Sequence, residues 1–145
     1  MQPTPRPSAL ASVAMGAVLG VLVLGSGGRL AMRGVTLWEH RPHLFSGAGT
    51  VTVLLWGAAF GAAAGALRAA LEAAFDRWAP AAPRIVRLTS FVAISFGAAL
   101  VVLTPWTLPR LVLFPVVVVI FLAAYEALWR RWGSRANISD GPTAR

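Results

Sequence analysis

The stretch GAAFGAAAGALR, residues 57–68, places Gly57, Gly61 and Gly65 four residues apart inside an apolar segment. Residues four apart share one face of a helix, and small residues on that face let a second helix approach closely in a membrane. At about 100° per residue, Arg68 continues the same face, whereas Phe60 falls in a sector of large side chains. The pattern predicts a helix that is packed on several sides and shows lipid a single ridge.

A second seam of small residues lies on the first apolar block. Ser12, Gly16 and Gly20 fall on one face of a helix that we expect to begin after Ser8, a suitable N-cap. Two seams of this kind fit against each other. We therefore expect the first two spans to be the closest pair, with these helix-packing residues: Ser12, Gly16, Gly20, Gly57, Gly61 and Gly65.

The bulk composition predicts an all-α integral membrane protein. Of the 145 residues, 57% are hydrophobic and 12% are charged, and the mean hydropathy is +0.70. Charged or proline-bearing segments divide the chain into apolar blocks of spanning length. We expect a membrane domain at 9–132 with four transmembrane helices in an antiparallel bundle, and no soluble domain. The spans are about 9–32, 49–78, 85–103 and 108–130, between a flexible N-terminal arm at 1–8 and a flexible C-terminal tail at 133–145.

The basic residues set the expected orientation. All thirteen are arginine, and nine of them fall on the side of the predicted bundle that holds both termini. By the positive-inside rule the N- and C-termini are cytoplasmic. The net charge is +8, but these arginines gather at span ends, so we exclude nucleic acid as a partner. A chain without lysine and rich in Ala, Gly and Pro is typical of a GC-rich bacterium, which places this multi-pass protein in the bacterial cytoplasmic (inner) membrane.

Several polar or aromatic residues are expected at the membrane surfaces. Arg29 and Arg33 stand one turn apart at the end of the first span, where long cations reach lipid headgroups. An anion or headgroup site at a broken helix, or pairing with a partner subunit, are the alternatives. The full set expected to contact the interface, lipid or a partner is Arg29, Arg33, Arg68, Glu72, Glu126, Arg130, Trp38, Trp106, Trp129 and Trp132.

Two charge pairs have helical spacing. Arg68 precedes Glu72 by four residues, and we interpret this pair as part of a solvated stalk. Glu126 precedes Arg130 by four in the more favourable order, which predicts an interfacial ion pair. A proton-handling role for Glu126 is the alternative.

The residues that catalysis would need are missing from the expected spans. The chain has no cysteine, and both histidines fall in the loop that contains Glu39, His40 and His43. Pro42 interrupts that cluster and no further ligand lies nearby, so we predict no metal site and no catalytic site. We expect no cofactor, while a lipid or pigment bound between helices stays open.

These observations predict a small non-catalytic membrane protein rather than an enzyme. We expect an accessory, structural or assembly subunit of a larger bacterial membrane complex. It would associate with the lipid bilayer and, through GxxxG-type faces, with other membrane-protein subunits or with itself. The alternative is a small oligomeric channel or transporter, although pumps and carriers usually place charges at mid-membrane depth.

Overall fold

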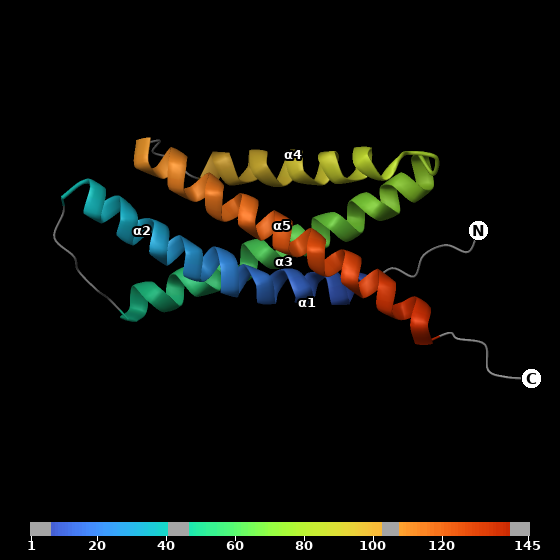
Figure 1. Cartoon of the computed structure of the whole chain (residues 1–145), viewed down its shortest axis with the longest axis horizontal. Coiled ribbons are helices and arrows are strands. Elements are labelled where there is room, and N and C mark those ends of the chain that lie inside the picture. Colours follow the sequence, from blue (N-terminus) through green and yellow to red (C-terminus); the bar gives the residue numbers. More distant parts are fainter. Residues whose placement is uncertain (1–6, 41–46, 103–107, 140–145) are drawn as a thin grey trace, which may run out of the picture.

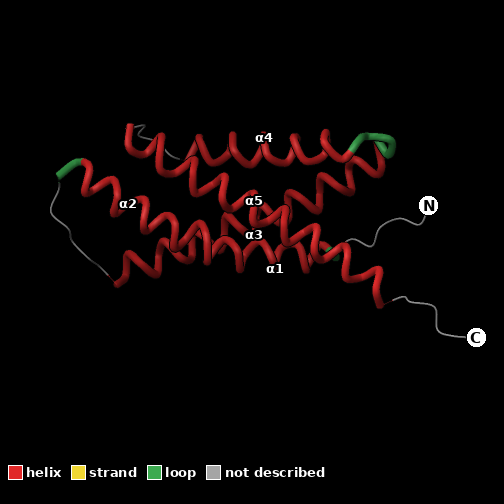
Figure 2. The backbone as a smooth tube through the Cα atoms, viewed as in Figure 1, coloured by secondary structure: helices red, strands yellow, loops and turns green. Residues whose placement is uncertain are grey.

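The computed structural model describes residues 7–40, 47–102 and 108–139, and their regular structure is entirely helical (Figures 1 and 2). Helix α1, the π-helical segment η1 and α2 follow one another without interruption, so the described chain forms four long rods. The all-α prediction is confirmed. The elements in chain order are α1 (Ala9–Leu19), η1 (Gly20–Gly25), α2 (Ser26–Trp38), α3 (Gly47–Trp78), α4 (Arg84–Val102) and α5 (Leu108–Ser139).

Three stretches of helix in the described residues are long and apolar enough to cross a membrane. They are Ala9–Trp38, Gly47–Trp78 and Leu111–Arg131. Many of their large apolar side chains point outward: Trp56 is 60% exposed and Phe60, stacked on it at 5.6 Å, is 42% exposed. Such surfaces are consistent with a membrane protein. Four spans remain a prediction, because α4 is not one of the three.

Facing glycines bring α1 and η1 against α3, in the lower middle of Figure 1. An ideal Cβ built on Gly61 would lie 2.7 Å from the Cα of Gly20, and one on Gly65 would lie 2.9 Å from the Cα of Val13. Real Cβ atoms essentially never come that close to another atom. The two helix backbones therefore touch along the seam, at a separation that only glycine permits there.

The π-helical turn η1 sits opposite Gly57. Residues five apart are bonded in a π turn, so Gly20 and Gly25 come to lie on the same side of the rod. An ideal Cβ on Gly57 would lie 2.6 Å from the carbonyl oxygen of Gly20 and 2.9 Å from the Cα of Gly25. The wider turn thus extends the close contact with α3 by one more glycine than a regular α-helix would.

The buried apolar core joins α1, α4 and α5 beside this seam. Tyr125 is fully buried, and its ring lies 5.7 Å from that of Phe91 and 6.1 Å from that of Phe121. The Tyr125 hydroxyl donates a 3.4 Å hydrogen bond to the carbonyl oxygen of Ser12, so it also ties α5 to α1. The core residues are Met15, Phe91, Phe121, Leu122 and Tyr125.

The helix ends differ in two places from the predicted spans. The first rod continues past residue 32 to Trp38 and ends where His40 adopts a left-handed φ of 53°. The glycines at 25–28 do not end it, because η1 and α2 take them into helical turns. Helix α5 continues to Ser139, into the region that the sequence assigns to a flexible tail.

Candidate functional site

A cluster of charged side chains joins the C-terminal third of α3, the start of α4 and the C-terminal half of α5. Its centre is Glu126, which is 8% exposed. One oxygen, Oε1, accepts from Arg84 of α4 and from Arg130 of α5 at 3.0 Å each. The cluster comprises four arginines and three acids: Arg68, Arg84, Arg87, Arg130, Glu72, Asp76 and Glu126.

Arg68 is the most deeply buried cation of this cluster, with 2% of its surface exposed. Its Nη2 lies 3.0 Å from Glu72 Oε1 and 3.7 Å from Glu126 Oε2. The guanidinium carbon lies 5.3 Å from the ring centres of both Phe91 and Trp129, so aromatic rings flank the charge. This burial differs from the solvated stalk that the spacing of Arg68 and Glu72 suggested.

Arg87 fastens the start of α4 to the end of α3. Its Nη1 donates to Glu72 at 2.9 Å and to Asp76 at 2.8 Å, and its Nη2 donates to the carbonyl oxygen of Pro80 at 3.3 Å. The guanidinium carbon also lies 5.5 Å from the ring centre of Phe75. One side chain thus holds two helices and the turn between them, which suits the many donors of a planar guanidinium.

The other interfacial residues expected from the sequence are spread over the molecule. Arg29 donates to the Thr50 hydroxyl and so links α2 to α3, whereas Arg33 is exposed on α2. Trp38 is exposed at the end of α2, far in sequence from the charge cluster. Trp129 is half-buried and stacks on Tyr125 at 6.1 Å. Trp106 and the side chain of Trp132 lie outside the described residues.

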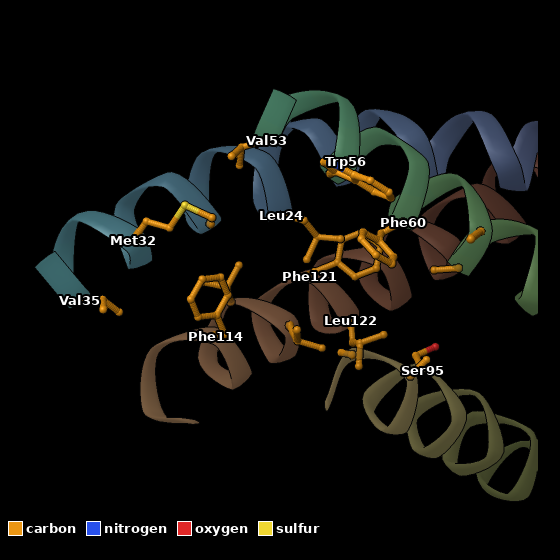
Figure 3. Close-up of a pocket in the computed structure, with 18 of the residues that line it drawn as sticks. Leu24, Met32, Val35, Val53, Trp56, Phe60, Ser95, Phe114, Phe121 and Leu122 are labelled. Carbon is orange, nitrogen blue, oxygen red and sulfur yellow. The ribbon is translucent and has the colours of Figure 1, made fainter. Parts of the chain in front are cut away.

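An apolar groove of about 960 Å³ opens between α2, α3, α4 and α5 (Figure 3). Leu24, Met32 and Val35 come from the first rod, and Trp56 and Phe60 stand on the α3 wall. The floor and the far wall come from α5 and α4: Phe114, Val117, Val118, Phe121, Leu122, Ser95, Ala98 and Ala99.

Polar groups are sparse along this groove. Thr36 and Glu39 lie at the end formed by the last turn of α2. Ser95 supplies a hydroxyl from α4, and its buried Oγ makes no hydrogen bond within the described residues. At the opposite end the buried rings of Phe91 and Tyr125 lie between the groove and the charge cluster. The groove and the cluster are therefore separate features.

In the part of the chain that the structure describes, no three His, Cys, Asp or Glu side chains converge as metal ligands. His43 of the candidate cluster lies outside that part. Each carboxylate of the buried cluster is bonded to arginine, an arrangement that ties helices together. Each of these contacts pairs a guanidinium with a carboxylate.

Comparisons with protein-family models, with curated proteins and with solved structures gave no match.

The sequence pattern missed the groove and the contacts between helices that join the charge pairs Arg68–Glu72 and Glu126–Arg130 into one cluster. Arg84 and Arg87 carried no signal beyond flanking an expected span, and Tyr125 carried none. A further signal in the sequence was that Arg68, Glu72 and Asp76 extend a buried glycine face at a spacing of four, which places them toward the neighbouring helices.

Proposed function

We propose that this chain is a non-catalytic membrane protein with four spans, which acts as an accessory or assembly subunit of a larger membrane complex. In this arrangement α4 is the remaining span and both termini are cytoplasmic. Arg68 is 21 residues from Gly47, or about 31 Å along a helix, close to the thickness of a bilayer's hydrocarbon core. The charge cluster then lies at the cytoplasmic membrane surface, where arginines are favoured.

The face of α4 that points away from the groove carries this proposal. At about 100° per residue, Ala93 and Gly97 lie on the face opposite Ser95 and Ala99. Both are exposed, and no heavy atom lies within 4 Å of an ideal Cβ on Gly97. Small residues four apart on a membrane helix favour close contact with a second helix.

The glycine seam cannot bind a partner helix, because its two glycine-lined faces pack against each other within the chain. Gly16 and Gly20 face Gly61 and Gly57 within one chain. We therefore propose that a partner helix contacts the small residues of α4 and not the glycines of α3. The described anchors of α4, Arg84, Arg87 and Phe91, all lie in its first two turns, which leaves the Ala93–Gly97 face uncovered.

Purification in a gentle detergent from the native host tests this function. We expect the parent chain to co-purify stoichiometrically with other membrane-protein subunits. Gly97→Leu should abolish that association, because a bulky side chain prevents close helix contact. Ala59→Leu, on an exposed position of α3, should leave it intact. A lone homo-oligomer that conducts ions in liposomes would instead support the channel alternative, and a partner-free parent would contradict the proposal.

A further inference from the structure

We propose that the groove between α2, α3, α4 and α5 binds the acyl chain of a membrane phospholipid. The inference rests on the four-span arrangement proposed above and adds a ligand site to it. A cavity of about 960 Å³ is at the upper end of the range of roughly 300–1,000 Å³ found for small-molecule pockets. Three of its walls, formed by α2, α3 and α5, belong to the stretches that are long and apolar enough to span a membrane.

The shape and lining of the groove fit a hydrocarbon chain. On the α3 wall it extends from Val53 to Leu67, which are 14 residues and about 21 Å apart. That length exceeds the roughly 15 Å half-thickness of the hydrocarbon core, so a chain seated there lies straighter than in a fluid leaflet. The stacked rings of Trp56 and Phe60 stand on this wall (Figure 3).

The same lining argues against a partner helix as the occupant. Membrane helices that pack closely carry small residues where they cross. Here the groove is lined by the bulky rings of Phe60 and Phe121 in its middle and of Phe114 nearer its α2 end, and a flexible chain can follow such a surface. Two small residues of α4, Ala98 and Ala99, line the groove and widen it. They lie on the side of α4 opposite the face proposed to contact a partner helix.

The two ends of the groove differ in polarity, and this difference indicates how the lipid is oriented. Thr36 and Glu39 lie at one end of the groove, on the last turn of α2, which is the outer surface in the proposed topology. The headgroup lies there, beside a hydroxyl and a carboxylate. The other end is lined by Leu67 of α3 and Leu122 of α5, so the chain terminus lies against apolar side chains.

The test is lipid retention by the full-length chain. The parent is reconstituted into vesicles of phosphatidylethanolamine and phosphatidylglycerol, extracted in a mild detergent and examined by native mass spectrometry. We expect one phospholipid per chain to survive washing that removes all others. Ala98→Phe and Ala63→Phe fill the groove from two walls and should lower retention by about tenfold, which corresponds to about 1.4 kcal/mol.

Two further variants are controls. The first tests whether lipid binding is separate from partner contact on α4, and the second tests whether the ligand is held by a hydrogen bond. Ala93→Phe adds the same ring to the opposite face of α4, so it should retain the lipid while it loses the partner proposed above. Ser95→Ala removes the one hydroxyl of the α4 wall and should leave retention unchanged, since a hydrocarbon chain needs no hydrogen bond. Equal retention in all the variants, loss of lipid in Ser95→Ala, or an isoprenoid or polypeptide in place of phospholipid would overturn the assignment.

Discussion

The guanidinium of Arg68 on α3 faces the carboxylate of Glu126 on α5, with Nη2 3.7 Å from Oε2. Both residues are buried, at 2% and 8% exposure, and 58 positions separate them in the sequence. Removing one member of a buried ion pair leaves the other charge uncompensated, which destabilises more than the pair itself stabilises. The end of the bundle therefore depends on both charges together.

Glu126→Gln should lower the free energy of unfolding by about 3 kcal/mol, because it removes the negative charge that pairs with Arg84, Arg130 and Arg68. Thermal unfolding in a mild detergent measures this loss. Arg33→Gln, an exposed residue on α2, is the control and should change stability by less than about 0.5 kcal/mol.

The double variant Arg68→Met/Glu126→Met distinguishes charge pairing from simple loss of packing. With both charges gone, we expect the double variant to be at least as stable as Glu126→Met alone, since no cation is left buried beside an apolar side chain. Strictly additive losses would show that the two side chains act independently.

Gly61→Leu should prevent folding or assembly, since a side chain there would collide with the backbone of Gly20. Phe60→Leu, the neighbouring position on the exposed ridge, should be mild. Native gels and the yield of monodisperse protein report the difference. If both variants behave like the parent, the seam is not a contact face.

Tyr125→Phe should cost about 0.5–1 kcal/mol, because it removes the hydrogen bond to the Ser12 carbonyl oxygen and keeps the buried ring. Tyr125→Ala, which also empties the core, should cost about 3–5 kcal/mol. Unfolding midpoints of the two variants give the comparison. Equal losses in the two variants would mean that the hydroxyl, and not the ring, carries the stability.

The sequence was informative where the chemistry is local. Apolar blocks predict the rods, and glycine spacing predicts which faces of α1 and α3 can approach each other. A spacing of four also predicts the pairs Arg68–Glu72 and Glu126–Arg130, which the structure contains at 3.0 Å each. These features depend only on the geometry of a single helix.

Contacts between distant helices could not be predicted in the same way. Arg84 and Arg87 reach Glu126 and Glu72 only because α4 turns back beside α3 and α5. The six residues of η1, GVLVLG, have the sequence of an ordinary apolar helix, so the sequence does not predict a π turn there. The contact between Gly25 and Gly57 of α3 depends on that π turn. The groove likewise depends on how far α4 stands from α3, which no local pattern encodes.

The membrane topology is the property on which the proposed roles of α4, the cluster and the groove all depend. The chain has no cysteine, so single cysteines at Ser8, Gly47, Ala81 and Leu108 can be labelled with a membrane-impermeant maleimide in intact cells. We expect labelling at residues 47 and 108 only, with Ser8→Cys and Ala81→Cys labelled after the membrane is opened. Labelling at residue 81 in intact cells, on the same side as residue 47, would contradict the four-span arrangement.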